Sequence, residues 1–350
     1  MRNKIMRKLS IIFCAFFSLQ ANNSNAKNNS VKYLHKFAPK SDKIKIYKKL
    51  GIAAGVTTTV AIGGLLGSYA YKNSDNVFQR KLIGSSDKIR EINAADDLTN
   101  IKKQKIEIDK MQGYIYSSPD NVSNGELFGK YVIFYSGSGS SNTFQIPDVA
   151  EEYVRQGAVV IGVDYMGFGE SGDKISSGKI REKDIYNDGF KIYNHVINNM
   201  KINPENIIIH GYSLGGPVAA HVAALALKSK KDLGGLVLQS SMKNTSNAVY
   251  ELLKNENQTT RLLGTLGGYL FADSFDCVKE LKNIYRQNPD IPIAICGGGE
   301  SDHLRLERTK LDVIAKEIGF KNLNVHNGEK EHILDEKAPK ENFKLPNLNK

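Results

Sequence analysis

The stretch His210-Gly211-Tyr212-Ser213-Leu214-Gly215-Gly216 decides the fold of this chain of 350 residues. The apolar run Ile207-Ile208-Ile209 precedes it, and an alanine-rich helical pattern follows it. The order predicts a buried strand, a sharp turn and a helix, which is the context that a G-x-S-x-G serine requires. Glycine is needed at 211 and 215 because a side chain there would collide with the helix or the adjacent strand. The turn would hold the hydroxyl of Ser213 at the carboxyl edge of a sheet.

Strands and helices alternate on both sides of this turn. Short apolar or alternating runs predict strands, and longer amphipathic segments predict helices. Their alternation predicts an α/β fold with a mostly parallel central sheet and helices on both faces, so ligands would bind at the carboxyl ends of the strands. The expected strands are 105–108, 113–116, 130–135, 158–163, 206–210, 235–239, 291–296 and 323–326, and the expected helices are 147–156, 184–200, 214–228 and 305–318.

Two more loops, together with the serine turn, resemble the alpha/beta-hydrolase superfamily over about 105–345. Residues 164–172, Asp-Tyr-Met-Gly-Phe-Gly-Glu-Ser-Gly, are similar to the family's D-Y-R-G-Y-G-x-S-x-G loop. Ser136-Gly137-Ser138-Gly139 stands where the family usually has H-G-x-G. The Leu-Gly-Gly after the serine is similar to the branch of membrane-anchored depalmitoylases and lysophospholipases. The resemblance implies the hydrolase fold with a small cap insertion, here about 242–288, and it leaves the substrate open.

The same resemblance implies a serine hydrolase whose catalytic residues follow the order serine, acid, histidine. Ser213 would be the nucleophile, and its hydroxyl needs a base to take its proton. His332, in the polar loop after the last expected strand, is the favoured base, and His326, inside that strand, is the alternative. Asp302, after the preceding strand, is the expected acid, with Glu300 as the alternative.

An oxyanion hole needs two backbone N–H groups aimed at the developing charge. Leu214, which follows the nucleophile, and Ser138, in the loop after strand 130–135, are the expected donors. Ser136 replaces the histidine that is usual in that loop, and Met166 replaces the arginine of the other loop. His210 is expected to be a satisfied, semi-buried histidine without a chemical role.

The sequence predicts no cofactor and no metal, because its histidines and carboxylates lack the spacing of zinc ligands. Gly297-Gly298-Gly299 is not followed by Gly-Lys-Ser/Thr, so it does not predict a phosphate loop. Gly167-x-Gly169-x-x-Gly172 has the form of a dinucleotide motif, but polar residues 173–178 follow where a helix should begin. Whether Cys277 and Cys296 form a disulfide stays open.

The formal charge of +11 is concentrated at the amino-terminal end. Residues 1–110 contain 21 Lys and Arg against 8 Asp and Glu, whereas the rest contains 27 against 29. A basic strip beside an apolar segment favours the flank of a membrane over a nucleic-acid-binding face. A solvated tail is the alternative explanation.

Residues 1–26 are typical of a secretory signal peptide, with a basic start, an apolar run over 9–19 and small residues at 24–26. A basic region, 27–104, follows, and its uncharged segment 51–70 is long enough to span a bilayer. A surface helix or a hydrophobic hairpin is the alternative for this segment. The lysines before it favour a cytoplasmic amino side, but a cleaved leader would place that side outside, so the side of the membrane stays open.

These features predict a membrane-associated serine hydrolase that needs no cofactor and does not bind nucleic acid. It would cleave an ester or thioester of a lipid-like or acylated substrate through an acyl-Ser213 intermediate. The apolar residues between 252 and 271 of the cap insertion motivate the lipid-like substrate, and packing in the core is the alternative explanation for them. Two alternatives remain: a catalytically inactive hydrolase-fold protein that binds a partner at a membrane, and an acyltransferase with an acceptor other than water.

Overall fold

The computed structural model describes most of the domain that the sequence predicts, within the compact unit Asp75–Lys350. The predicted signal peptide and the apolar segment 51–70 lie outside the described residues. No helix of the described part is both long enough and apolar enough to cross a membrane. The described residues are 101–119, 125–138, 142–171, 180–229, 232–253, 258, 261–262, 265, 273–297, 304 and 306–327.

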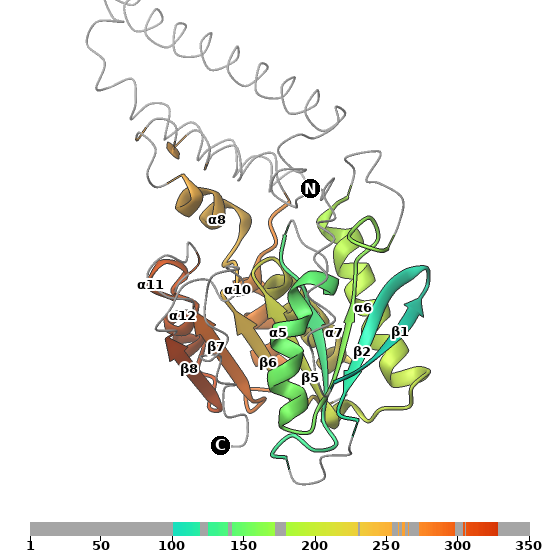
Figure 1. Ribbon diagram of the computed structural model, residues 1–350. Helices are drawn as coiled ribbons and strands as arrows, with labels where there is room; N and C mark the ends of the chain where they lie inside the picture. Colours follow the sequence, from blue (N-terminus) through green and yellow to red (C-terminus); the bar gives the residue numbers. More distant parts are fainter. Residues whose placement is uncertain are drawn as a thin grey trace, which may run out of the picture. The chain divides into compact units, whose positions relative to one another are not determined.

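Eight strands form one sheet in the order β1-β2-β4-β3-β5-β6-β7-β8 (Figure 1). The first two strands pair antiparallel with each other, and β2 pairs antiparallel with β4, while β3 to β8 run parallel. The predicted fold class is therefore confirmed. The strands are β1 Lys102–Ile108, β2 Met111–Ser117, β3 Tyr131–Tyr135, β4 Val159–Val163, β5 Ile207–Tyr212, β6 Gly235–Gln239, β7 Ile293–Gly297 and β8 Leu323–Asn327.

The central strands are apolar almost throughout because helices cover both faces of the sheet. Every residue of β5, β6 and β7 is buried. The edge strand β1 instead exposes four of its seven residues and carries three lysines, Lys102, Lys103 and Lys105. Charged side chains on an edge strand discourage pairing with a second molecule.

The helices divide between the two faces of the sheet (Figure 1). Residues of α5 share a buried cluster with Val132, Ile208 and Val237 on one face. Helices α6, α7, α10 and α12 contribute to a larger cluster on the other face. The described helices are α5 Asn142–Arg155, α6 Glu182–Asn198, the 3₁₀ helix Pro204–Asn206, α7 Gly215–Lys228, α8 Thr245–Leu252, α10 Cys277–Gln287, α11 Leu306–Thr309 and α12 Leu311–Ile318.

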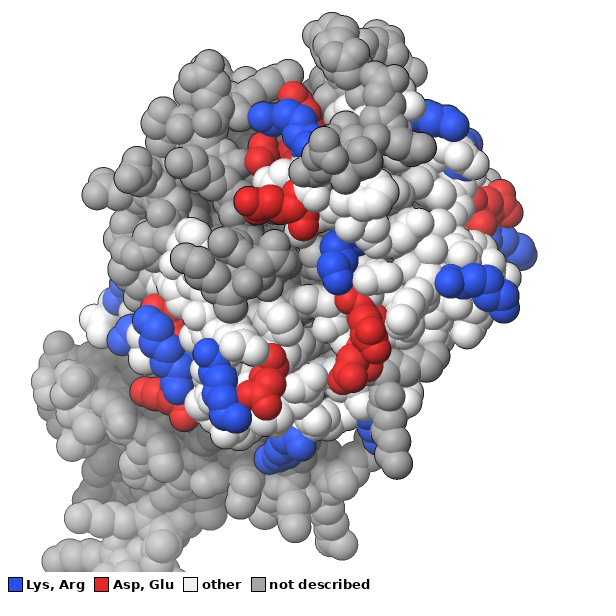
Figure 2. Space-filling view, turned by 90° about the horizontal axis from the view of Figure 1, so that it is seen from below, with Lys and Arg blue, Asp and Glu red and all other residues white. Residues whose placement is uncertain are grey.

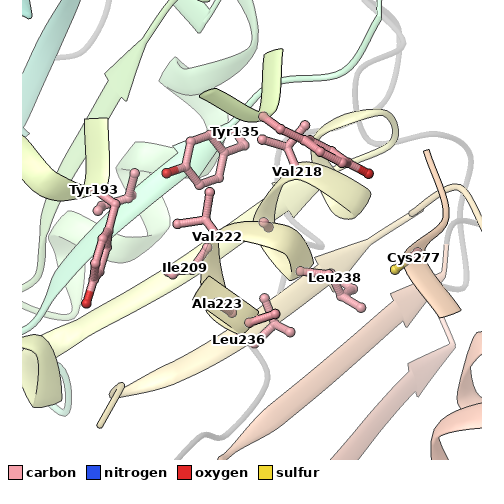
Figure 3. Packing of buried hydrophobic residues seen from close by; sticks show 14 of the residues in the cluster. Tyr135, Tyr193, Ile209, Val218, Val222, Ala223, Leu236, Leu238 and Cys277 are labelled. Atoms are coloured by element: carbon pink, nitrogen blue, oxygen red, sulfur yellow. The ribbon is translucent and has the colours of Figure 1, made fainter. Parts of the chain in front are cut away.

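Helix α7 packs directly on the central strands. Figure 3 shows Val218 and Val222 of α7 close to Ile209 of β5, with Leu236 and Leu238 of β6 beside them. All five side chains are completely buried. Burial of each such aliphatic side chain stabilises the fold by about 1.5–3 kcal/mol, so this contact fixes the helix that begins at the serine turn.

Two predicted segments differ in detail from the structure. The helix expected over 305–318 is split, because Lys310 adopts a left-handed conformation with φ of 52° between α11 and α12. The predicted cap insertion, 242–288, contains helix α10, whose Cys277, Leu281 and Ile284 belong to the core. Most of the apolar residues between 252 and 271, for which a cap and the core were both open, lie outside the described residues.

Acidic and basic side chains are mixed on one face of the described domain. On the face drawn in Figure 2, Lys and Arg (blue) are interspersed with Asp and Glu (red). This mixture agrees with the near balance of charge over 111–350 in the sequence.

Candidate active site

The serine turn connects β5 to α7 at the carboxyl edge of the parallel strands. Ser213 is half-buried and has a φ of 52°, a left-handed conformation that few residues other than glycine adopt. Such a conformation costs about 1 kcal/mol, so the surrounding structure must hold it. The helix begins two residues later, which places Ser213 beside the partial positive charge of a helix amino terminus.

The two glycines of the motif are required by close packing. A Cβ on Gly211 would overlap the carbonyl group of Gly215, and a Cβ on Gly215 would overlap the carbonyl oxygen of Tyr135 in β3. These obstacles are backbone atoms, which cannot move aside. The steric reason predicted for both glycines is therefore confirmed, and helix α7 starts in direct contact with β3.

The end of β6 and the segment after it hold Ser213 on both sides. The N–H of Ser213 donates to the carbonyl oxygen of Gln239 at 3.0 Å. Its carbonyl oxygen accepts from the N–H groups of Gly216 and Met242, each at 3.1 Å. Between those anchors, Ser240 also has a positive φ, 43°, and its N–H donates to Cys296 in β7. Four main-chain hydrogen bonds thus fix the turn and the segment that supports it.

The loop after β3 lies against the serine. A Cβ on Gly137 would come within 3.1 Å of the Ser213 Cβ, so the glycine lets this loop approach the nucleophile closely. Ser138 follows and is exposed, while Leu214, at the start of α7, is completely buried. The side chain of Ser136 is also buried, and none of the described residues forms a hydrogen bond with its hydroxyl. The two expected oxyanion donors thus come from the two segments that meet at Ser213.

His210 is not available as a base. Its ring is completely buried beneath the sheet edge, with Tyr153 Oη 3.1 Å from Nδ1 and Gln239 Oε1 2.9 Å from Nε2. Burial lowers the pKa of His210 to about 3, although the bond to Gln239 opposes this effect. The structure agrees with the prediction of a satisfied histidine, but its burial is complete where the sequence indicated partial burial.

His221 belongs to a different cluster on α7. Its ring stacks on Tyr186 at a centroid distance of 4.1 Å, and its Nδ1 lies 3.4 Å from Glu280 Oε1 on α10. These contacts tie α7 to α6 and α10, so they explain the residue without any chemistry.

The second family loop closes on itself after β4. Asp164 is buried and accepts from the N–H of Glu170 at 3.0 Å, and the Ser171 hydroxyl donates to the Asp164 carbonyl oxygen at 2.7 Å. Met166, in the arginine position, exposes its side chain, and its N–H donates to Asp188. The motif therefore shapes a turn beside the sheet edge.

The structure describes only one of the residues predicted as acid or base. Asp302, Glu300 and His332 lie outside the described residues. His326 is described: it lies in β8 opposite Cys296 of β7, three strands away from β5. Among the described residues, no group of three or more His, Cys, Asp and Glu side chains could hold a metal ion.

The sheet order, the two-sided helical cover and the serine turn together define the alpha/beta-hydrolase fold. Residues 130–295 match the family model described as serine aminopeptidase, S33. The crystal structure of an alpha-beta hydrolase from Vibrio vulnificus has a TM-score of 0.58 and 26% identity to this chain, covering 73% of this chain and 86% of that one.

Two curated relatives are multifunctional-autoprocessing repeats-in-toxin proteins. The one from Vibrio vulnificus is 32% identical over 199 residues, or 54% of this chain, and the one from Vibrio cholerae is 35% identical over 145 residues, or 41%. This chain spans 4% and 3% of the length of these toxins. The similarity therefore concerns one small part of each toxin.

Proposed function

We propose that this protein is a serine hydrolase that cleaves an ester or thioester through an acyl-Ser213 intermediate. The supporting observation is the strained turn of Ser213, which is held between two glycines that tolerate no side chain. Strain of this kind persists where the surrounding structure over-determines it, and it is concentrated at functional sites. The loop after β3 and the start of α7 also meet at this serine, as an oxyanion hole requires.

In the proposed reaction, His332 takes the proton of the Ser213 hydroxyl while Oγ attacks the carbonyl carbon of the substrate. The N–H groups of Leu214 and Ser138 donate to the oxyanion of the tetrahedral intermediate. The imidazolium then protonates the leaving alcohol or thiol, and the acyl group stays on Oγ. Water, activated by the same histidine, attacks the acyl-enzyme and releases the acid. Asp302 would orient His332 and stabilise its charged form.

Two observations support this choice of acid and base. His326 lies inside β8, opposite Cys296, so its side chain belongs to a face of the sheet rather than to its edge. The segment directly after β6, which begins with Ser240 and Ser241, offers no carboxylate. The loop after β7 contains both Glu300 and Asp302.

Labelling with a fluorophosphonate probe tests the nucleophile. Wild type should be labelled, and Ser213→Ala should not, because the probe forms its bond with an activated serine. Ser229→Ala is the matched control, since this serine lies at the other end of α7 and its hydroxyl donates to the Leu225 carbonyl oxygen. Absence of labelling in wild type, or equal labelling of Ser213→Ala, would refute the proposal.

Paired substitutions test the acid and the base. His332→Ala should abolish labelling, whereas His326→Ala should leave it nearly unchanged. Asp302→Asn should reduce the rate strongly, because the histidine loses the group that stabilises its positive charge. Glu300→Gln should have little effect. The reverse pattern in either pair would assign the role to the other residue.

A lipid-like acyl group is the proposed substrate class. Apolar side chains stay exposed on two segments that leave the carboxyl edge: Met166 after β4 is 39% exposed and Tyr250 on α8 is 40% exposed. Hydrolysis of acyl esters of increasing chain length, of a lysophospholipid and of an S-acylated peptide would compare the classes. A preference for short acyl chains would contradict the proposal.

Two tests address the alternative functions. Added alcohol acceptors distinguish acyl transfer from hydrolysis. Full biological effect of Ser213→Ala would favour an inactive binding protein.

Membrane association is part of the proposal and rests on the uncharged segment 51–70 of the sequence. The full-length protein should sediment with membranes and resist alkaline extraction. Val60→Lys combined with Leu66→Lys should release it, since a charge at the centre of a span is costly. Equal membrane binding of the double variant would refute the anchoring role.

A further inference from the structure

A chain of three buried side chains runs behind the serine turn, on the α5 face of the sheet. Tyr153 of α5, His210 of β5 and Gln239 of β6 are each 1% exposed or less. The tyrosine hydroxyl lies 3.1 Å from one imidazole nitrogen of His210, and the Gln239 side-chain oxygen lies 2.9 Å from the other. Both ring nitrogens of this histidine are therefore satisfied by side chains from different elements.

The chemistry of Gln239 fixes the direction of these hydrogen bonds. Its amide oxygen can only accept, so Nε2 of His210 must carry the proton. In the neutral ring Nδ1 then has the free electron pair, and the hydroxyl of Tyr153 donates to it. Each group thus donates to the next, and hydrogen bonds arranged in this way strengthen one another in a low-dielectric interior.

The chain ends at the nucleophile. The carbonyl oxygen of Gln239 accepts the hydrogen bond from the Ser213 N–H, so the residue whose side chain is held by His210 also supports the serine. Met242, three residues further on, donates to the carbonyl oxygen of Ser213. A shift of Gln239 would therefore move the segment that holds the serine from both sides.

We propose that Gln239 is a positioning residue for Ser213 and that Tyr153 and His210 act through it. This inference rests on the proposed hydrolase function. The side chains fix the carboxyl end of β6 relative to β5 and α5, and the main chain of β6 then holds the serine in its left-handed conformation. None of the three side chains is required to touch the substrate.

The expected effect concerns the rate of attack by the serine rather than substrate binding. Misplacement of a reacting group by about 1 Å can lower a rate by about a hundredfold. We therefore expect Gln239→Met, which keeps the length of the side chain but removes the acceptor, to slow attack by about tenfold to a hundredfold. The apparent affinity for the probe should change little.

Labelling kinetics with a small fluorophosphonate measure this attack in the full-length protein. The rate constant at saturating probe and the half-saturation concentration are measured for wild type and Gln239→Met. The temperature is kept well below the lowest thermal unfolding midpoint of these proteins. Gln287→Met is the matched control, because that side chain also loses a hydrogen bond, to the Ala224 carbonyl oxygen on α7, at a point unconnected with Ser213. Its rate constant should match wild type.

A double-mutant cycle tests whether the three residues act as one chain. Tyr153→Phe and Gln239→Met alter bonds to different nitrogens of His210, so their effects can be coupled through that ring. We expect the double variant to be labelled no more slowly than Gln239→Met alone. Independent, multiplicative effects of the two substitutions on the labelling rate would contradict the proposal that the three residues act as one chain.

The outcomes separate this inference from the proposed function. A wild type that is not labelled overturns both. A labelled wild type, with Gln239→Met as fast as Gln287→Met, overturns the positioning role and leaves the hydrolase proposal intact.

Discussion

The burial of His210 predicts that this protein loses stability as the pH falls. The free imidazole has a pKa of 6.5, and burial lowers the pKa of His210 in the folded protein to about 3. The unfolded chain therefore takes up a proton as the pH passes below 6.5, while the folded protein stays neutral at this position until about 3. Folding stability must fall across that interval, because protons bind preferentially to the unfolded state.

The size of the effect follows from the difference in bound protons. Above pH 6.5 the ring is neutral in both states and contributes no pH dependence. Each further pH unit below that value removes up to about 1.36 kcal/mol, so about 1.5 units, down to pH 5, remove about 2 kcal/mol. His210→Asn lacks the titration, and its amide oxygen can still accept from the Tyr153 hydroxyl.

Urea unfolding of the full-length protein at about pH 8 and about pH 5 measures the free energy of unfolding for both proteins. Wild type should lose about 2 kcal/mol more than His210→Asn between these conditions. Burial also raises the pKa of Glu182 and of Asp188, but these groups are the same in both proteins, so their contributions cancel in the comparison. Equal losses of unfolding free energy in the two proteins would show that His210 does not stay neutral in the folded state. The neutral tautomer with its proton on Nε2, inferred from Gln239, would then be wrong.

Three further predictions concern Gly211, Asp273 and the two cysteines of the domain. Gly211→Ala should cost more than about 3 kcal/mol or prevent folding, because its Cβ would overlap backbone atoms of α7; a thermal melt close to that of wild type would contradict this. Asp273→Ala should lower the free energy of unfolding by about 1–3 kcal/mol, since Asp273 accepts two hydrogen bonds from Arg181, at 2.9 and 2.8 Å, and urea titration would measure the loss. The buried, unpaired thiols of Cys277 and Cys296, whose pKa burial raises to about 12, should resist alkylation at neutral pH until the protein unfolds, as mass spectrometry can check.

The sequence could predict the serine turn because every requirement of that turn is local. Gly211 and Gly215 flank Ser213 within five residues, and the strand and helix that they join are continuous patterns on either side. The same holds for the eight strands, all of which the structure contains close to their expected positions. Short apolar runs are unambiguous when each is followed by a turn and an amphipathic segment.

The hydrogen-bonded chain behind the turn could not be predicted in this way. Tyr153 lies 57 residues before His210, and Gln239 lies 29 residues after it. Alternation along a strand gives the face on which a side chain lies, but the register between β5 and β6 and the placement of α5 decide which side chains meet there. For the same reason, a histidine directly before the turn gave no sign of complete burial.

The segment 242–288 shows a different limit of prediction from the sequence. Apolar residues at helical spacing are expected both for a cap and for a core helix, so the pattern could not separate the two. The structure places Leu281 and Ile284 of α10 in the core, whereas α8 exposes Tyr250. The break at Lys310 was equally hidden, because a lysine in a left-handed conformation leaves no mark on the hydrophobic period.

The strained conformation of Ser213 requires that several independent contacts hold it in place. The left-handed conformation of Ser213 costs about 1 kcal/mol, and one hydrogen bond of about that net value could be lost without unfolding the domain. The turn would then relax and the hydroxyl would leave its position, although the fold would persist. Three main-chain hydrogen bonds to Ser213, two glycines in backbone contact and a buried polar chain behind Gln239 all oppose that relaxation. Substitutions that only remove a hydrogen bond of this region, such as Gln239→Met, should therefore reduce activity well before they reduce folding. Gly211→Ala is different because its Cβ would overlap backbone atoms. Substitutions on the α10 side of the core should reduce folding before activity.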